Sequence, residues 1–251
     1  MIDDTRIGVG GTGFPQTHWS ALRAVSSDYQ PDREKALGMI VTAYWKPVYK
    51  YIRIQWQKSN EDAKDLTQGF FLRVIEKDFL KPYDPSKARF RTFLRICLTG
   101  YVANEEKSSG RKKRGGDVTT FSLDFTDVEN ELVNSSALHE LSTDDPEQFF
   151  HNELIRSLFT LSVEDLKKEC EANGKTVRFR IFERYDLRDD AKPTYEQLGK
   201  ELGIATSQVT NHLFSTRKEF RNIVLQRLKS LCSTEEEYRS EAESLFGINP
   251  K

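Results

Sequence analysis

The sequence predicts an all-α protein made of two helical domains joined by an acidic linker. Apolar residues recur at three- and four-residue steps in most of the long segments, which is the spacing of one buried helix face. No section is rich in strand patterns, and no internal repeat is evident. Basic and acidic residues are also segregated along the 251 residues, so a formal net charge of −1 conceals regions of opposite sign.

The first predicted domain spans residues 31–114 and follows an N-terminal extension, residues 1–30. Its first helix covers residues 31–57, where apolar residues follow the helical period. Proline has no backbone N–H and clashes with the preceding turn, so Pro47 is expected to kink or break this helix.

Two further helices complete the first domain. Ser59 followed by Asp62 forms an acidic variant of a capping box and predicts the start of the second helix, which ends before Pro82. A third amphipathic segment runs from Phe90 to about Glu106. Three helices of this length predict a small helical bundle.

The acidic linker is placed at residues 115–146. Lys and Arg are absent from Asp117 to Glu153, and no long periodic segment occurs there. The acidic residues of the stretch are Asp117, Asp124, Asp127, Glu129, Glu131, Glu140, Asp144, Asp145, Glu147 and Glu153. At most short local structure is expected, and a merely disordered spacer remains an alternative.

The second predicted domain covers residues 147–231. A helix follows Pro146 and ends near Asn173, and a short helix is expected around residues 177–185. A C-terminal amphipathic tail, residues 232–251, contains one more capped helix.

A helix-turn-helix is the most informative part of the second domain. Thr194 and Gln197 have capping-box spacing, Gly203 ends the first helix, and a long helix follows after a few residues. The residues expected to read bases at its N-terminal end are Ser207, Gln208, Thr210 and Asn211, and those expected to contact phosphates are Arg217, Lys218 and Arg221. A solvated helix face is the alternative interpretation.

A basic segment with interleaved aromatic residues runs from Arg89 to Arg114. It holds eight basic residues against two acidic ones. Cations neutralise a nucleic-acid backbone and aromatic rings stack on unpaired bases, so this composition suits melted DNA. Aromatic residues at helical spacing more often belong to a core, and Phe93 is expected to be one of these.

Other classes of protein are disfavoured. The cysteines Cys97, Cys170 and Cys232 lie far apart among apolar residues and are expected to be structural thiols. No histidine pair has metal-ligand spacing, and no nucleophile, base and oxyanion arrangement is present, so neither a cofactor nor an enzymatic activity is expected. Gly8, Gly10 and Gly13 match a dinucleotide-binding pattern but lack its strand and helix context. No apolar run could span a membrane, which predicts a cytoplasmic protein without membrane insertion.

Four motifs resemble, in order, those of extracytoplasmic-function sigma factors of the sigma-70 family of bacterial RNA polymerase. They are Asp65-Leu-Thr-Gln-Gly-Phe-Phe, Phe90-Arg-Thr-Phe-Leu-Arg-Ile, the basic Arg111-Lys-Lys-Arg, and the helix-turn-helix ending at Arg217-Lys218. The resemblance implies a sigma-2-like bundle and a sigma-4-like helix-turn-helix. It implies a promoter-specificity subunit that assists promoter opening.

The resemblance also implies partners and site residues. Asp65, Gln68 and Phe71 would bind the clamp of the polymerase core, and the second domain would dock on its flap and read the minus-35 element. The residues implied for minus-10 recognition and melting are Asp84, Ser86, Lys87, Arg89, Arg91, Asn104, Lys107, Arg111, Lys112, Lys113 and Arg114. The acidic linker resembles the segment that sigma factors thread through the active-site cleft. An anti-sigma factor is left open as a further partner.

Two alternatives remain from the sequence. A helix-turn-helix regulator would dimerise on a palindromic operator and would not need the Asp65 to Phe71 face. A sigma-derived interaction adaptor without promoter melting is favoured by Thr210, His212 and Ser215, positions that are often basic in the family.

Overall fold

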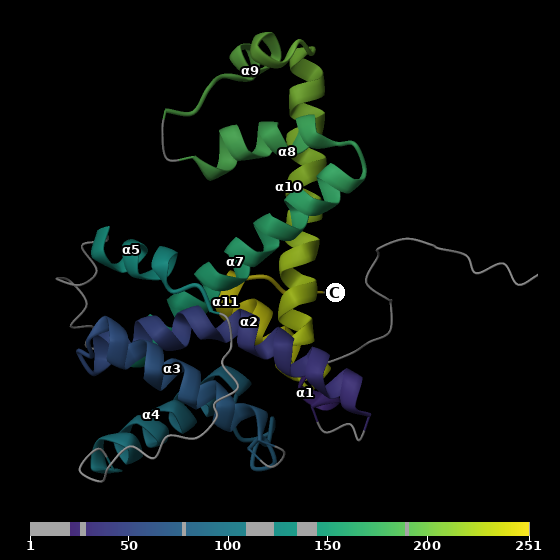
Figure 1. The fold of residues 1–251 in the computed structure, drawn as a ribbon. Coiled ribbons are helices and arrows are strands. Elements are labelled where there is room, and N and C mark those ends of the chain that lie inside the picture. Colours follow the sequence, from purple (N-terminus) through teal and green to yellow (C-terminus); the bar gives the residue numbers. More distant parts are fainter. Residues whose placement is uncertain are drawn as a thin grey trace, which may run out of the picture.

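The structure, a computed structural model, describes residues 21–25, 29–76, 79–108, 123–134, 145–188 and 191–250. Every regular element in these ranges is helical, which confirms the predicted all-α class. The base of the molecule contains α1 (Ala21–Ala24), α2 (Gln30–Gln55), α3 (Asn60–Ile75) and α4 (Phe90–Ser108), with α5 (Thr126–Asn134) beside it (Figure 1).

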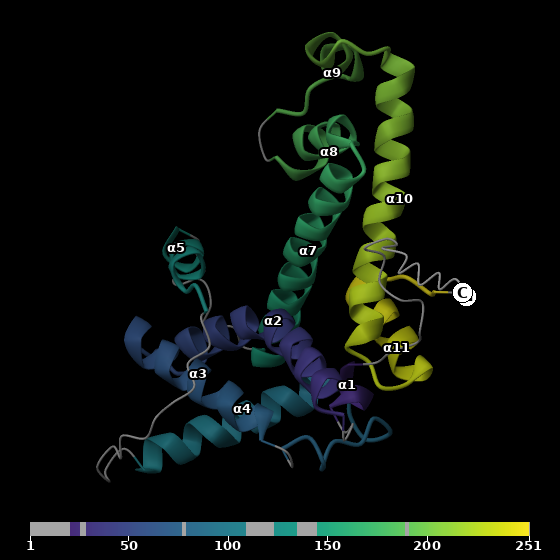
Figure 2. The ribbon, with the colours of Figure 1, turned by 45° about the vertical axis from the view of Figure 1, so that its right-hand side comes forward.

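Two long helices rise from this base and lie side by side, as Figures 1 and 2 both show. They are α7 (Pro146–Ala172) and α10 (Thr206–Ser230). At their far end lie α8 (Thr176–Phe182), a π-helical turn η1 (Glu183–Leu187) and α9 (Tyr195–Leu202). The last helix, α11 (Glu235–Phe246), returns to the base.

The predicted helix ends are confirmed where side-chain caps define them. The Ser59 hydroxyl accepts the Asp62 N–H at 3.1 Å, and Thr194 and Gln197 form the predicted reciprocal capping box. Gly203 and Gly247 end their helices with φ of 67° and 63°, a left-handed conformation that glycine adopts without a steric penalty.

The helix α2 runs unbroken through Pro47, so the break that the sequence allowed for does not occur. A proline leaves the carbonyl four residues earlier without its helical donor, and here that is the Ala43 oxygen. The buried Ser157 hydroxyl of α7 donates to this oxygen at 2.8 Å. The hydrogen bond that Pro47 removes from α2 is therefore supplied by α7.

The first turns of α7 pack into the same core as α2. The Phe150 ring meets the Tyr51 ring edge to face at 5.4 Å between centroids. Lys50 Nζ lies 2.9 Å from Glu153 Oε2, with side-chain exposures of 7% and 3%. Contacts between α7 and α2 thus cross the predicted domain boundary at residue 147. Whether this boundary separates two folding units stays a prediction.

The C-terminal tail also belongs to this core. Its residues Cys232, Tyr238, Ala242 and Leu245 are buried in the cluster that contains the α2 residues, together with Leu228 and Leu231 at the end of α10. Two smaller clusters lie farther along the long helices, and one of them joins α8, α9 and α10 through Ile181, Leu198, Val209 and Leu213. The helix-turn-helix therefore has a core of its own at the end away from the base.

Residues 123–134 of the acidic linker contain α5, which is docked on α2. Phe125 packs against Trp45 and Tyr49 at centroid separations of 5.3 and 5.1 Å. Arg53 NH2 lies 2.6 Å from Glu129 Oε1, and Lys50 Nζ lies 2.7 Å from Glu131 Oε2. Arg53 hydrogen bonds hold the pKa of Glu129 below its ordinary value. These carboxylates are engaged with the first domain.

Several single-residue expectations can be placed as well. Cys170 and Cys232 are buried and Cys97 is half-buried, and all three are free thiols. Phe93 is partly buried at the edge of the core, where its ring meets that of Tyr83 at 5.3 Å. Among the described residues, no helix is both long and apolar enough to cross a membrane.

We expect Ser157→Ala to lower the free energy of unfolding by about 1–3 kcal/mol, because the buried Ala43 oxygen loses its donor. Urea unfolding measures this. Ser162→Ala is the matched control, since Ser162 is equally buried on α7 but its hydroxyl donates to the Leu158 oxygen of its own helix. Equal losses in the two variants would contradict a special role for the Ala43 contact.

Candidate nucleic-acid interface

The turn between α9 and α10 is held by a close backbone approach. Ile204 N–H donates to the Gly199 oxygen at 2.9 Å. A Cβ at Gly199 would lie 2.8 Å from the Ile204 oxygen, closer than real Cβ atoms approach. Only glycine fits at this position without a shift of backbone, so the sequence specifies the angle at which α10 leaves the turn.

The residues predicted to read bases are all exposed at the start of α10. They are Ser207, Gln208, Thr210 and Asn211. Gln208 has a second role, because its side-chain oxygen accepts the Ala205 N–H at 2.9 Å and satisfies a free donor at the helix start. The Thr210 hydroxyl donates to the Thr206 oxygen at 3.3 Å. Asn211 makes no such local bond through its side chain in the described part of the chain.

The predicted phosphate contacts on α10 differ in availability. Arg217 forms a bidentate ion pair with Asp186, with Nε and NH2 at 2.8 and 2.7 Å from the two carboxylate oxygens. That bonding raises the pKa of Arg217. Lys218 and Arg221 are exposed. The strongest free positive charge on this face therefore comes from Lys218 and Arg221, while Arg217 must exchange Asp186 for a phosphate.

The loop before α4 is ordered by its own polar residues. Asp84 accepts the Ser86 N–H at 3.0 Å and the Ser86 hydroxyl at 2.7 Å, and Lys87 Nζ lies 3.3 Å from its other oxygen. The Ser86 hydrogen bonds lower the pKa of Asp84. Farther along α4, Asn104 and Lys107 are exposed. The predicted residues Arg111, Lys112, Lys113 and Arg114 lie outside the described residues.

Arg89 and Arg91, which the resemblance implies for minus-10 recognition, are both paired with α11 in this conformation. Arg89 Nε lies 3.1 Å from Glu241 Oε1, and Arg91 Nε lies 3.2 Å from Glu241 Oε2. The Arg91 side chain is only 8% exposed. Burial lowers the pKa of Arg91 and raises that of Glu241, while the attraction between the two charges opposes both shifts. DNA cannot reach Arg91 while α11 is in place.

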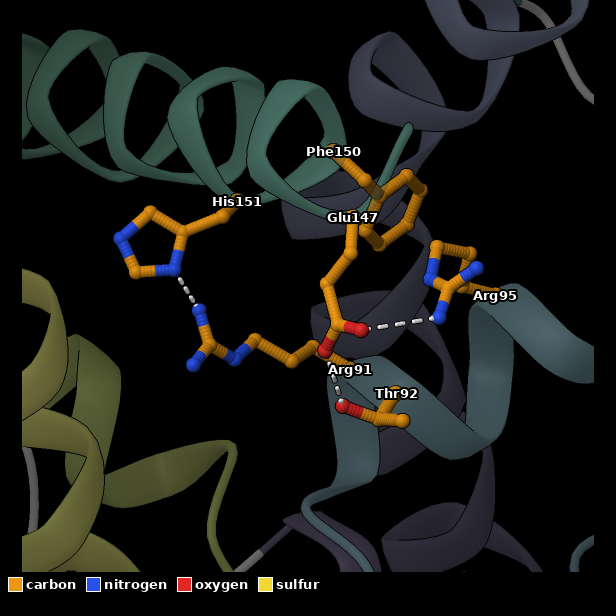
Figure 3. A pocket seen from close by; sticks show the side chains of 6 residues that line it. All are labelled: Arg91, Thr92, Arg95, Glu147, Phe150 and His151. Carbon is orange, nitrogen blue, oxygen red and sulfur yellow. Dashed lines mark hydrogen bonds and ion pairs between the residues drawn. The ribbon is translucent and has the colours of Figure 1, made fainter. Parts of the chain in front are cut away.

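The polar cluster around Arg91 continues onto α7. Figure 3 shows the Arg91 guanidinium directed at His151, to whose Nδ1 it donates, and Arg95 directed at Glu147, with Arg95 NH2 3.2 Å from Glu147 Oε2. Burial and the Arg91 charge lower the pKa of His151, which keeps the ring neutral as an acceptor. The cavity between them measures about 10 Å³, which is the space of a single water rather than of a small-molecule ligand.

The residues predicted to bind polymerase core separate into two groups on α3. Asp65 is exposed and Gln68 is partly exposed, and they lie three residues apart on one side of the helix. Phe71 is fully buried, with an exposed fraction of 0%, and its ring packs on Phe70. The prediction of a direct contact by Phe71 is therefore wrong for this conformation, because the ring supports the face from inside.

Glu237 and Glu241 are the residues that sequence reasoning missed. Both are nearly buried, at 6% and 4% exposure. They stand four residues apart and next to the apolar positions Tyr238, Ala242 and Leu245. Acidic residues that share the buried side of an amphipathic helix indicate partners of opposite charge, and that signal was available in the sequence.

Comparison of the chain with protein-family models, with curated proteins and with solved structures gave no match. Among the described residues, no group of three or more His, Cys, Asp or Glu could hold a metal ion. Function is therefore inferred from the geometry of the two charged and polar surfaces of this chain.

We expect Gly199→Ala to destabilise the helix-turn-helix by about 1–3 kcal/mol, because the added methyl group collides with backbone that is itself hydrogen-bonded. Urea unfolding and hydrogen exchange of α9 amides measure the loss. Gly38→Ala is the control, since a Cβ there meets nothing within 4 Å and should stabilise α2 by about 0.5–1 kcal/mol. A neutral Gly199→Ala would argue against the close turn.

Proposed function

We propose that this chain is a cytoplasmic sigma factor, which binds RNA polymerase core, directs it to promoters and assists their opening. The observation that carries the proposal is the separation of two candidate DNA surfaces in one helical molecule. The exposed start of α10 lies at one end of the paired long helices, and the loop and helix α4 lie in the base at the other end (Figures 1 and 2).

The two surfaces suit two tasks. An exposed helix start with short and amide side chains can enter the major groove of duplex DNA at a minus-35 element, with Lys218 and Arg221 on phosphates. The loop at Asp84 to Lys87 and the arginines at the start of α4 suit an unpaired strand at a minus-10 element. Binding only the opened strand would favour the melted state of the promoter.

Polymerase core is the proposed protein partner. Asp65 and Gln68 offer a polar face on α3 whose neighbours Phe70 and Phe71 are buried, so that face can be covered without unfolding the bundle. The second domain would dock on the flap, and the acidic linker would enter the active-site cleft. For residues 126–134 that entry requires α5 to leave its ion pairs with Arg53 and Lys50.

An interaction adaptor that does not melt promoters is the second candidate. Three of the arginines predicted to contact DNA, Arg89, Arg91 and Arg217, are already paired with carboxylates of the same chain. A protein that used these domains only for contacts with other proteins would have no need to separate these arginines from their carboxylates.

Run-off transcription with purified core polymerase, with and without the chain, tests the proposal. We expect promoter-specific transcripts only when the chain is present. Stable binding to core without any transcript would favour the adaptor. Duplex binding as a dimer to a palindromic site, without core binding, would favour an ordinary regulator.

We predict that Asp65→Lys combined with Gln68→Ala weakens binding to core polymerase about tenfold or more, because both side chains share one exposed face. Co-elution and titration with labelled core measure the change, and an unchanged circular dichroism spectrum would show that the fold is intact. Glu164→Lys on the exposed side of α7 is the charge-matched control and should bind as the wild type. If both variants bound equally well, α3 would not be the contact.

We predict that Asn211→Ala costs about 1–3 kcal/mol at particular minus-35 base pairs and leaves other positions unchanged. Asn211 is a cleaner probe than Gln208, whose oxygen also caps the start of α10. Holoenzyme binding to a panel of single-base promoter variants measures this. Gln226→Ala, far along the same helix, should have no effect. A uniform loss across all sequences would instead mean that Asn211 contacts the backbone.

A further inference from the structure

The C-terminal helix α11 fills a site on the base with two carboxylates. Glu237 Oε1 accepts the Phe90 N–H at 3.0 Å, and the Tyr83 hydroxyl donates to the same oxygen at 2.5 Å. Glu241 lies between Arg89 and Arg91, at 3.1 and 3.2 Å from their Nε atoms. One carboxylate therefore caps the start of α4, and the other neutralises two arginines at the same place.

Hydroxyl groups of α11 complete the arrangement. Arg89 NH1 donates to the Ser244 hydroxyl at 2.8 Å, Arg89 NH2 donates to Ser240 at 3.0 Å, and Arg91 NH2 donates to Ser244 at 3.1 Å. The contacts join residues about 150 positions apart in the chain. Three hydrogen bonds and two ion pairs between the same two segments indicate a built site, not an incidental approach of surface side chains, although Arg91 Nε and Glu241 Oε1 make no well-aligned hydrogen bond.

The chemistry of the site is that of an anion receptor. A helix N-terminus carries unpaired N–H donors and a partial positive charge, which attract anions. Arginine guanidinium groups bind carboxylates and phosphates with similar geometry. The receptor is formed by the start of α4 with Arg89 and Arg91, and Glu237 and Glu241 are its ligands in this conformation.

We propose that α11 is an internal competitor of DNA: its two carboxylates occupy the phosphate-binding site at the start of α4, and the backbone of a single DNA strand replaces them when α11 leaves. The inference deepens the proposed function and rests on it. Arg91 is buried in this conformation and its Nε lies 3.2 Å from Glu241, so a phosphate can reach the guanidinium only where Glu241 and α11 have moved away.

The position of α11 in the chain fits such an exchange. It follows α10 after a connection of a few residues and contributes no residue to the helix-turn-helix cluster. Its Tyr238, Ala242 and Leu245 pack on the base core, which holds the closed state in addition to the ion pairs. Release of α11 would leave the exposed face of α10 intact while uncovering Arg89 and Arg91.

The test measures binding of the full chain to a fluorescein-labelled 20-nucleotide single strand by anisotropy over a range of salt. Glu241→Gln keeps the size of the side chain and one acceptor oxygen, but removes the competing charge. We expect it to bind about tenfold tighter than the wild type, which corresponds to about 1.4 kcal/mol. The log–log salt slope should steepen by about 0.7 for each further phosphate that the variant neutralises. Inorganic phosphate, added at a concentration equal to that of the phosphate groups in the labelled strand, should not displace the strand.

Glu243→Gln is the matched control, since it makes the same charge change two residues away on an exposed side of α11. It should bind like the wild type. Equal affinity of the Glu241→Gln and Glu243→Gln variants would overturn the proposal. If the Glu241→Gln variant does not fold, the double variant Ser240→Ala, Ser244→Ala weakens the contact between α11 and the two arginines less severely. It should raise the affinity for the single strand about threefold. No rise in affinity with this variant would then overturn it.

Hydrogen exchange supplies a readout that a purely structural helix would not give. Adding the strand to the wild type should accelerate exchange of α11 amides while leaving α3 amides protected. Unchanged protection of α11 in the saturated complex would rule out the competition. Run-off transcription separates the two proposals: no transcript with a tighter Glu241→Gln variant rejects the sigma function alone, and normal transcription without that tighter binding rejects the competition alone.

Discussion

The docking of α7 on α2 is the constraint on which the rest of the arrangement depends. Pro47 leaves the Ala43 oxygen without a donor inside the core, and the Ser157 hydroxyl is what satisfies it. Lys50 and Glu153 pair one turn away, where neither charge could stay unpaired. The crossing of the two helices is therefore fixed by polar groups with strict geometry, within a surface that apolar packing alone would leave free to slide.

That crossing decides where the two candidate surfaces lie. Because α7 is rooted in the base, α10, which packs along it, carries the helix-turn-helix away from α3 and α4 (Figure 2). The C-terminal end of α10 brings Leu231 and Cys232 back to the base core, and α11 then lies against the start of α4. The packing of α7 on α2 thus sets the separation of the two candidate surfaces, and it also brings the carboxylates of α11 to the base.

Local signals in the sequence predicted the helices well, because caps, turns and apolar periods act over a few residues. Ser59, Thr194 and Gly203 fix their helix ends through bonds within three or four positions. The continuity of α2 and the burial of Arg91 depend on partners more than 100 and 140 residues away, Ser157 and Glu241, and no local pattern shows that these residues pair with α2 and with Arg91. At the candidate site, exposure at the start of α10 followed from helix-turn-helix geometry, whereas Phe71 was misplaced because its motif was interpreted without knowing which face is buried.

Pairing of arginines with carboxylates of the same chain would allow a protein with a formal net charge of −1 to carry the proposed DNA-binding surfaces. Arg53, Arg91 and Arg217 each have a carboxylate of this chain within 3.2 Å. The positive charge of each arginine is therefore neutralised locally by its own ion-pair partner. A nucleic acid approaching such a surface is attracted less at long range than by free arginines, since each pair is close to neutral beyond the Debye length. Under the proposed function, binding of a nucleic acid would exchange the internal carboxylate for a phosphate, a step with little net change in the number of ion pairs. An equilibrium between two such similar states is one that a partner can shift with a modest difference in affinity.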